Sequence, residues 1–588
     1  MTKFESTKTS NDSTSTPPMT GAHAVAGVIS RMTDPIVFGM PGGYTMQIYD
    51  GIHAHDDRIK TVLVREESLA TIMAEAHGRM TGNPAVVIGQ GAWVLGNAGI
   101  GIMEALLGCS PMVILIDATD HGSFSHLGPY QGGLGGYGSY DLVAAMRAIT
   151  KRTFVANDPT QALQMTQLAI KHATVGEQGP VAVVFTSRSL YGVMSAGTEP
   201  PAYLDRSYAG PAIVKAPDRE LDAVIAAIRV AKTPVIIAGN GVRVSGSEGA
   251  LLRFADQAGI PVATTPAGKG TFPEDHPLAL GIMGPFGHET AIAGIGSADM
   301  IIALGTKLGT SDTANYSPRM IDASRQTLVQ IDIDPLNLAW TQPIDIPVQG
   351  DLADALPRLA ALMSHSTSGG EQRVQLLREE HGYYGRALTS TPGNFSARDA
   401  VTVLSQELPN DAVVTCDAGE NRLYMLHDFQ SKQGGTVLQP NGGGGMGYAV
   451  PAAAAVAIDF PGRPAVAVCG DGGMAMTLHG LVTAVELGLK MIVVVLDNQI
   501  LGWVYHGQKS RVIASEFGDF DYAAIARAIG CNATSTGDVE SFRDALRGAL
   551  DFNGVSVVVA RTSRDDRYQQ MMSSLSIGDP YAVSGDDD

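Results

Sequence analysis

Cysteine is scarce in this chain, and its positions follow no spacing that would bind a metal or build a disulfide framework. Four cysteines are scattered through 588 residues, three of them in or beside apolar segments. We therefore expect reduced, buried thiols and a cytoplasmic protein. The four are Cys109, Cys416, Cys469 and Cys531.

Positive charge and long apolar runs are also lacking. Lys and Arg number 40 against 59 Asp and Glu, a formal net charge of −19, which argues against a nucleic-acid surface. No apolar run approaches the roughly 20 residues of a membrane span, so we expect no membrane partner. With 45% hydrophobic and 17% charged residues, the chain has a globular composition suited to a small-molecule substrate.

The two ends of the sequence are poor in apolar residues. Residues 1–19 are polar and rich in Ser and Thr, without the apolar core of a signal peptide, and predict a disordered lead-in. Residues 571–588 end in GDDD and predict a frayed acidic tail.

Between the ends, short β-branched runs alternate with helical patterns, among them a helix over 67–80. This alternation predicts an α/β protein with three doubly wound parallel-sheet domains. We place them at 20–195, 210–365 and 385–570. The first and third are alike in size and alternation, without a sequence repeat. The predicted strands are 36–39, 61–64, 84–89, 110–117, 179–186, 233–241, 260–265, 299–305, 327–335, 412–417, 436–439, 465–470, 491–497 and 555–560.

One β-α-β unit carries polar residues at the ends of both its strands. AVAVCG is followed by Asp471-Gly472-Gly473, and MIVVVLD by Asn498, 27 positions after Asp471. Open α/β sheets bind ligands at such ends. An oxygen-only set of carboxylate and amide suits Mg²⁺ bridged to a diphosphate, and the glycines allow a ligand to approach the backbone. The alternative is a plain turn beside an unrelated Asn.

This unit resembles the GDG-x26-NN motif of thiamine diphosphate (ThDP) enzymes, with Asp497 in place of the first Asn. The resemblance implies Mg²⁺ held by Asp471, Asn498 and the carbonyl of Ile500, and cofactor contacts at Gly472 and Gly473.

The order of the three units resembles the acetolactate synthase and pyruvate oxidase-like branch of that family. In this branch a pyrimidine-binding domain comes first, a central Rossmann-type domain that can hold FAD or ADP comes second, and a diphosphate-binding domain comes last. Residues 264–281 and 331–340 look like the central domain of that branch.

Glu67 follows the strand at 61–64, where the family has the Glu of an Arg-His-Glu sequence; Glu66 replaces the His. The resemblance implies that Glu67 is catalytic. It would share a proton with the cofactor's aminopyrimidine ring, whose imino form then makes the nucleophilic ylide. Two glutamates favoured by the dipole at a helix start are the alternative.

The segment 90–97, QGAWVLGN, aligns with the family's TSGPGATN and puts Asn97 at a cofactor-contacting wall. Ala92-Trp93-Val94 replaces Gly-Pro-Gly, which changes the shape of this wall and hence the expected substrate. Gly42, in the turn after the first strand, is a further implied cofactor contact.

The run GGGGMG at 442–447 aligns with the family's GGLGAMG. Met446 matches the Met that props the cofactor into its bent shape, and Gly444 is implied to contact the cofactor; a core Met is the alternative. Upstream, Gly419 and Asn421 align with a diphosphate-contacting turn, from which we leave out Glu420.

After Asn498 the resemblance implies cofactor contacts at Gly502 and Trp503. Acetolactate synthases have a Trp at the position of Gly507, and its absence argues against the branched-chain biosynthetic role. Trp503 and Tyr505 could wall the pocket or simply pack.

Four further residues are candidate substrate contacts. The glycine-rich stretch 121–138 contains His121, His126 and Gln131, the last matching a family Gln in a loop that faces the partner subunit's site. His77 stands where Tyr is common. Surface or packing roles are the alternatives for the histidines.

The sequence thus predicts a ThDP- and Mg²⁺-dependent lyase or transferase that cleaves or forms a C–C bond of a 2-oxo acid. Each site of a homodimer or homotetramer would need two chains. Three alternatives stay open: a 2-hydroxyacyl-CoA or acyloin lyase using the same ylide, an FAD-containing pyruvate oxidase-like enzyme, and a non-catalytic nucleotide-binding relative. Arg561, Arg564 and Arg567 could hold CoA phosphates, although we favour a solvated charge cluster.

Overall fold

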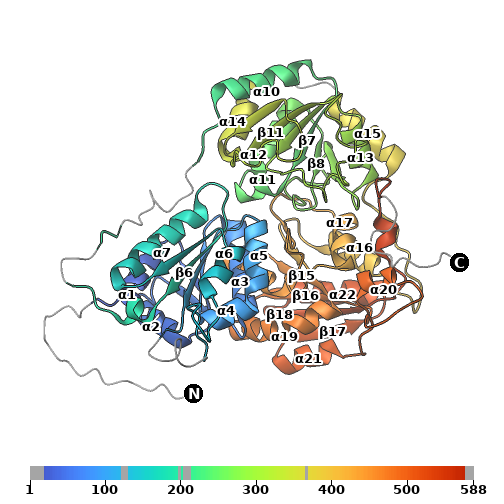
Figure 1. Cartoon of the computed structure of the whole chain (residues 1–588). Helices are drawn as coiled ribbons and strands as arrows, with labels where there is room; N and C mark the ends of the chain where they lie inside the picture. The colour runs from blue at the N-terminus through green and yellow to red at the C-terminus, as the bar shows by residue number, and fades with distance from the viewer. Residues whose placement is uncertain (1–18, 121–129, 196–199, 203–212, 364–368, 577–588) are drawn as a thin grey trace.

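Three parallel six-stranded sheets, each flanked by helices, make up the chain (Figure 1). The computed structural model describes residues 19–120, 130–195, 200–202, 213–363 and 369–576. The proposed N-terminal lead-in, apart from its last residue, and residues 577–588 of the proposed tail lie outside these ranges. The three sheets confirm the predicted fold class.

The first domain has the strand order β2-β1-β3-β4-β6-β5. Its strands are β1 (Ile36–Gly39), β2 (Lys60–Leu63), β3 (Ala85–Gly89), β4 (Met112–Asp117), β5 (Arg152–Ala156) and β6 (Pro180–Phe185). Its α-helices are α1 (Gly21–Ile29), α2 (Met46–His53), α3 (Glu67–Thr81), α4 (Gly91–Asn97), α5 (Gly99–Leu107), α6 (Leu142–Ile149), α7 (Pro159–Thr174) and α8 (Ser187–Tyr191).

The third domain repeats this order as β14-β13-β15-β16-β18-β17, although its sequence does not repeat that of the first. Its strands are β13 (Val413–Cys416), β14 (Val437–Leu438), β15 (Ala465–Gly470), β16 (Met491–Asp497), β17 (Asn532–Thr536) and β18 (Val555–Arg561). Its α-helices are α16 (Ala397–Glu407), α17 (Glu420–His427), α18 (Ala449–Asp459), α19 (Asp471–Glu486), α20 (Gly502–Gly507), α21 (Tyr522–Ile529) and α22 (Val539–Asp551).

The central domain has the order β12-β11-β10-β7-β8-β9. From the neighbouring strands β7 and β10, the later strands of the chain are added outward in opposite directions, as in a dinucleotide-binding fold. Its strands are β7 (Pro234–Ala238), β8 (Val262–Thr264), β9 (Ala279–Ile282), β10 (Met300–Leu304), β11 (Thr327–Asp332) and β12 (Ile346–Gln349). Its helices are α10 (Asp218–Val230), α11 (Asn240–Val244), α12 (Glu248–Ala258), α13 (Glu289–Gly296), α14 (Leu352–Leu362) and α15 (Gly370–His381).

One apolar cluster joins the first and third domains. Every residue of β4, β15 and β16 is buried, because helices cover both faces of these sheets. Between the two sheets, α3 packs against α18, whose alanine-rich sequence permits a close approach. This packing fixes the N-terminus of α3, where Glu67 lies, against the third domain.

Four strands that the sequence analysis did not predict, β5, β9, β12 and β17, all lie at sheet edges. Among the described residues, no helix combines the length and apolarity needed to span a bilayer.

Candidate active site

Asp471 and the turn after β16 meet at the carboxyl edge of the third sheet. Because β15 and β16 are adjacent, their ends lie side by side. Asp471 Oδ2 accepts a hydrogen bond of 2.6 Å from the Gln499 N–H, and Asn498 Oδ1 accepts one of 3.3 Å from the Ile500 N–H. Gln499 has a φ of +60°, so the turn folds back toward Asp471. The turn that carries Asn498 and Ile500 therefore lies next to Asp471.

Asp497, the departure from the family motif, lies beside Asp471. Burial, and then the charge of Asp497, raise the pKa of Asp471 to about 7. Asp497 is itself paired with Arg561, whose Nη1 lies 2.7 Å from Asp497 Oδ2. Two adjacent carboxyl groups with one guanidinium leave a negative potential at this edge, which favours a divalent cation.

The donor set fits Mg²⁺. It offers one carboxylate, one amide oxygen and one backbone carbonyl, all hard oxygen donors, which Mg²⁺ takes together with phosphate oxygens and water. The described part of the chain contains no group of three or more His, Cys, Asp or Glu that could hold a metal ion. A site with a single carboxylate ligand does not need such a group.

The predicted diphosphate turn lies beside the Asp471 turn. A Cβ built on Gly470 would lie 3.0 Å from Asn421 Nδ2, and one on Gly502 would lie 2.2 Å from Glu420 Oε2. Gly419 has a φ of +93°, which only glycine adopts without strain. Gly419, Asn421 and Gly502 thus surround the same edge, as a shared diphosphate site requires.

Glu420 turns away from this edge into the protein. Its Oε1 lies 2.7 Å from His506 Nδ1 and accepts the Tyr568 N–H at 3.0 Å, and its Oε2 accepts the Tyr424 hydroxyl at 3.1 Å. All three of these contacts are with protein groups, so Glu420 stays outside the proposed cofactor contacts.

Asp417, which the sequence analysis did not select, organises the same edge. A Cβ on Gly473 would lie 1.9 Å from its Oδ2, so the glycine is required by close packing. Burial raises the pKa of Asp417 to about 6. It accepts hydrogen bonds from the N–H groups of Gly447, Tyr448 and Ala449 at 2.6–3.0 Å. Its position at the end of the predicted strand 412–417 was the feature of the sequence from which Asp417 could have been selected.

The glycine-rich loop contacts the first domain through its backbone. The Gly444 N–H donates a hydrogen bond of 3.2 Å to the carboxylate of Glu104. The proposed cofactor contact at Gly444 stays a prediction. Met446 is half-buried two positions later.

Glu67 is 5% exposed at the first position of α3. The Asn97 side chain donates a 2.9 Å hydrogen bond to Glu67 Oε2 from the last residue of α4. This contact holds one carboxyl oxygen in a fixed direction. Glu66 caps the helix through the Ser68 N–H, so the two glutamates have different surroundings.

Gly42 and Gln131 lie close to each other at the carboxyl edge of the first sheet. Gln90 Nε2 donates a hydrogen bond of 2.5 Å to Gln131 Oε1. A Cβ on Gly42 would lie 3.5 Å from Gln90 Oε1. Asp117, at the end of β4, accepts the Tyr44 N–H at 2.6 Å and holds this turn. Gln90 and Asp117 are additions to the predicted set.

Three other predicted contacts are occupied by protein groups. His77 is 5% exposed, and its Nδ1 lies 3.0 Å from Asp459 of α18, a contact between two domains; its proposed substrate contact stays a prediction. Trp503 stacks on Tyr568 with the ring centroids 5.1 Å apart, and its proposed cofactor contact stays a prediction. Tyr505, half-buried, lies with its ring 5.7 Å from the Arg564 guanidinium. His121 and His126 lie outside the described residues.

The three C-terminal arginines do not form one anion site. Arg561 pairs with Asp497 and, at 2.5 Å, with Asp519. Arg564 pairs with Glu516 at 2.7 Å, and its Nε donates a hydrogen bond of 3.2 Å to the Asn498 carbonyl. Two of the three therefore support the turn at Asn498.

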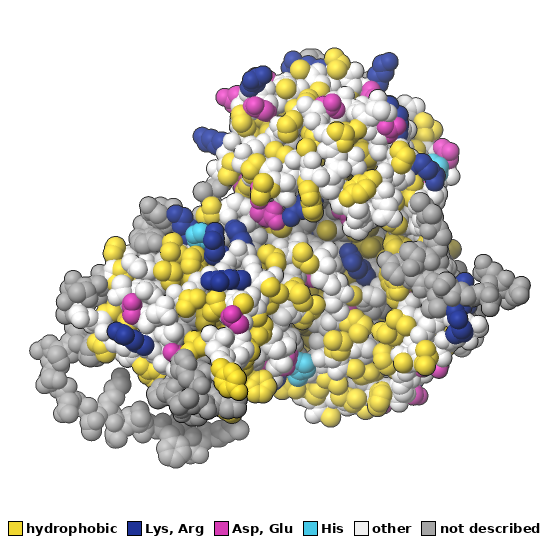
Figure 2. Space-filling view, viewed as in Figure 1, with side chains coloured by type: hydrophobic (Ala, Val, Ile, Leu, Met, Phe, Trp, Pro, Cys, Tyr) yellow, Lys and Arg dark blue, Asp and Glu magenta, His cyan; other side chains and the backbone are white. Residues whose placement is uncertain are grey.

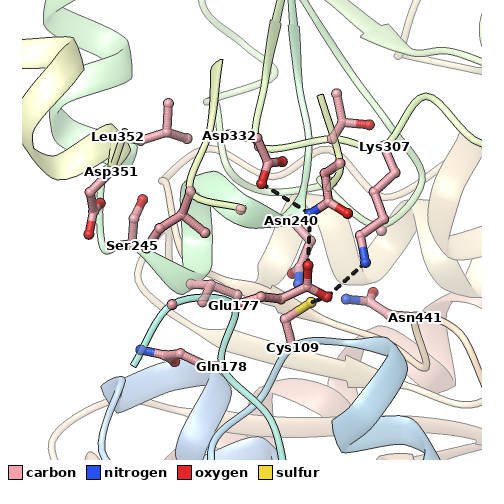
Figure 3. Close-up of a pocket in the computed structure, with 18 of the residues that line it drawn as sticks. Cys109, Glu177, Gln178, Asn240, Ser245, Lys307, Asp332, Asp351, Leu352 and Asn441 are labelled. Carbon is pink, nitrogen blue, oxygen red and sulfur yellow. Dashed lines mark hydrogen bonds and ion pairs between the residues drawn. The ribbon is translucent and has the colours of Figure 1, made fainter. Parts of the chain in front are cut away.

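A cavity of about 220 Å³ lies at the carboxyl ends of β7, β10 and β11 in the central domain (Figure 3). On one side, Lys307 Nζ lies 2.8 Å from Glu177 Oε1 of the first domain. Asn337 Nδ2 donates a hydrogen bond of 2.7 Å to Glu177 Oε2. Cys109 Sγ lies 3.3 Å from Glu177, and burial raises the pKa of its thiol to about 12, which disfavours the reactive thiolate. Residues 239–246, which include helix α11, line this cavity through Asn240, Gly241, Val244 and Ser245.

Family models and curated relatives agree with this geometry. Residues 19–134 match the N-terminal TPP binding domain of thiamine pyrophosphate enzymes, 221–359 their central domain, and 417–560 their C-terminal TPP binding domain.

The chain is 29% identical to the probable acetolactate synthase large subunit of Methanocaldococcus jannaschii, covering 90% of each chain. It is 28% identical to the acetolactate synthase large subunit of Corynebacterium glutamicum, covering 92% of this chain and 86% of the relative. It is also 28% identical to the acetolactate synthase isozyme 3 large subunit of Escherichia coli, covering 87% and 89%. The chain therefore belongs to the thiamine pyrophosphate enzyme family, as a ThDP-dependent enzyme of the acetolactate synthase type that acts on 2-oxo acids.

Proposed function

We propose that the protein is a ThDP- and Mg²⁺-dependent enzyme that breaks or forms the C–C bond next to the carbonyl of a 2-oxo acid, in sites shared by two chains. The observation that carries the proposal is the hydrogen bond from the Gln499 N–H to Asp471, which joins the two halves of the metal-binding motif. When bound, ThDP supplies the carbanion at C2 of its thiazolium ring and the electron sink.

The chain's own residues divide the remaining work. Asp471, Asn498 and the Ile500 carbonyl would hold the metal, and the turns at Gly419 and Gly472 would admit the diphosphate. Met446 would support the bent cofactor. The carboxyl group of Glu67, oriented by Asn97, would hold and exchange the proton of the aminopyrimidine ring. Burial of Glu67 keeps water from this proton.

Contacts within one chain support a shared site. Arg65 pairs with Glu486, and Glu66 Oε2 lies 3.7 Å from His479 Nε2. His479 stands eight residues after Asp471, or about 12 Å along α19. The N-terminus of α3 therefore faces the later turns of α19 in its own chain, and a second chain would bring another Glu67 to Asp471.

Exposed apolar side chains also support an assembly of at least two chains. Figure 2 shows hydrophobic side chains gathered on the third domain, over α19 and α21. Met476 is 51% exposed and Phe520 56%, while Leu63 and Trp93 of the first domain are each 51% exposed. Surfaces of this kind mark protein interfaces. We propose a homodimer or homotetramer.

The first experiment is calorimetry of the purified protein with ThDP and Mg²⁺, followed by a screen of 2-oxo acids for released CO2. Glu67→Gln should fold and bind ThDP but lose turnover by about 10²- to 10⁴-fold, because the amide cannot exchange the ring proton. Gln is nearly isosteric with Glu, so its thermal unfolding controls for packing. A fully active Glu67→Gln, or no ThDP binding by the wild type, would overturn the proposal.

A second candidate ligand is a nucleotide in the central cavity. The cavity lies where the strand order reverses, the position at which such sheets bind nucleotides, and Asp332 and Asp351 line it as acceptors for ribose hydroxyls. Its volume of about 220 Å³ suits an adenosine-sized group. A visible absorption spectrum of the pure protein tests for FAD, and calorimetry with ADP tests for the smaller ligand.

Substrate identity stays a prediction. Replacement of Gly-Pro-Gly by residues 92–94 and of the pocket Trp by Gly507 supports a substrate other than that of the biosynthetic enzyme. The four free cysteines support the proposed cytoplasmic location.

A further inference from the structure

Glu104 receives four successive backbone N–H groups of the loop 441–447. Its Oε1 accepts from Asn441 and, at 3.1 Å, from Gly442. Its Oε2 accepts from Gly443 at 2.9 Å and from Gly444 at 3.2 Å. Successive N–H groups that converge in this way form an anion-binding nest. Here the anion is a side chain of the first domain, 2% exposed on α5.

Packing against α5 explains why this loop is built of glycine. A Cβ on Gly442 would lie 2.3 Å from the Cβ of Leu107, and one on Gly445 would lie 2.9 Å from Cγ1 of Ile100. A Cβ on Gly443 would lie 2.8 Å from Glu104 Oε2. The loop backbone thus lies directly on the helix.

A buried charge network fixes the position of Glu104. Arg79, with a fully buried side chain, lies 3.4 Å from Glu104 Oε1 and pairs with Glu75. Arg79 Nη1 also donates a hydrogen bond of 2.6 Å to the carbonyl of Gln439, which lies just before the loop. Tyr448 lies just after the loop, and its hydroxyl donates a hydrogen bond of 2.7 Å to Glu75. The network therefore grips the loop from both sides.

Asp417 holds the other end of the same segment. It accepts the N–H groups of Gly447, Tyr448 and Ala449. Two carboxylates therefore bind the backbone before and after Met446. The position of this Met is set by both domains, and only one of the carboxylates belongs to its own domain.

We propose that Glu104 is a positioning residue of the active site, which holds the glycine-rich loop so that Met446 supports bound ThDP. The inference rests on the proposed cofactor site. Removal of the carboxylate leaves four N–H groups without a buried acceptor and takes one of its partners from Arg79, so the loop detaches from α5 and the cofactor loses its support.

Hydrogen exchange of the protein without cofactor tests the contact itself. In the wild type the amides of 441–444 should exchange slowly. Glu104→Gln places an amide NH₂ against two of these donors, and Glu104→Ala removes the acceptor. Both variants should speed exchange at 441–444 and spare 447–449, which Asp417 holds. Exchange unchanged by both variants would overturn the proposal.

Calorimetry with ThDP and Mg²⁺ separates positioning from general stability. Glu104→Gln and Glu104→Ala should raise the ThDP Kd and the KM for ThDP by about tenfold, the effect of losing one charged hydrogen-bond acceptor, and Glu104→Asp should restore part of it. Asp459→Asn is the matched control, since it breaks the contact of His77 between the same two domains, away from the loop. It should lower Tm without changing the ThDP Kd.

A ThDP Kd for all three Glu104 variants within twofold of the wild type, with only Tm lowered as in Asp459→Asn, would overturn the inference. If Glu104→Ala does not fold, Glu104→Gln and Glu104→Asp decide the outcome. Failure of the wild type to bind ThDP would instead count against the proposed function, and the exchange experiment would still test the contact.

Discussion

Asp497 alters the charge of the metal-binding edge without altering its shape. Asp and Asn have similar sizes, so the turn to Asn498 is retained, while an added carboxylate lies beside Asp471. Arg561 bridges Asp497 and Asp519 and balances part of the added charge. The sequence motif pointed to this edge of the sheet, but Arg561 follows Asp497 by 64 positions, and no local pattern links the two.

We predict that Asp497→Asn weakens Mg²⁺ binding to the ThDP complex by about tenfold. The substitution removes a negative charge near the cation, an interaction worth about 1 kcal/mol or more at an effective dielectric constant of about 20. The measurement is a Mg²⁺ titration at saturating ThDP. Asp519→Asn removes the other partner of Arg561, farther from the turn, and serves as the control with little change. Equal Mg²⁺ affinity in the wild type and Asp497→Asn would contradict this account.

Asp417 predicts a pH dependence of stability. Burial raises its pKa to about 6 from an ordinary value of 3.8, so the folded chain binds this proton more tightly than the unfolded chain. Its contribution to the free energy of unfolding is therefore fully present below about pH 4 and is lost as the pH rises through about 6.

Asp417→Asn cannot lose a proton in this range. The unfolding free energy of the variant should therefore rise relative to that of the wild type by up to about 3 kcal/mol between pH 4 and pH 7. Urea unfolding at both pH values, without cofactor, measures this. A constant offset reflects the altered hydrogen bonds to the loop. A difference that does not change with pH would show that Asp417 has an ordinary pKa.

At the scale of elements, the buried central strands were predictable and four edge strands were not. Runs such as MIVVVLD are apolar throughout because both faces of the strand are covered, and β16 has the predicted bounds. The unpredicted β5, β12 and β17 are partly exposed, so their apolar pattern is weak. β9 is buried but contains a glycine with positive φ. The order of the strands within each sheet, such as the position of β6 between β4 and β5, could not be predicted from the sequence and is known only from the structure.

The glycine-rich loop shows a second limit of sequence reasoning. Its motif indicated a cofactor contact, and its glycines are explained by packing against α5 and by a carboxylate 337 positions away in the sequence. A single sequence contains no sign of such a pairing. The same holds for Asn97 and Glu67, whose hydrogen bond depends on how α4 is placed beside α3.

At the scale of the whole molecule, one short segment would serve two catalytic centres of the proposed assembly. In the proposed assembly, Asn97 at the end of α4 orients the Glu67 that faces the partner's metal site. Glu104 in the next helix, α5, holds the loop beside the chain's own metal site. A shift of α4 and α5 would therefore affect both centres of a dimer.

Mixed dimers test the shared site directly. Chains carrying Glu67→Gln and chains carrying Asp471→Asn should each be inactive alone. When they are unfolded together and refolded at equal concentration, half of the dimers are mixed, and each mixed dimer has one intact site built from the unaltered Glu67 of one chain and the unaltered Asp471 of the other. Activity should return to about a quarter of the wild type. If each site lay within one chain, every chain in the mixture would carry a damaged site, and no activity would return.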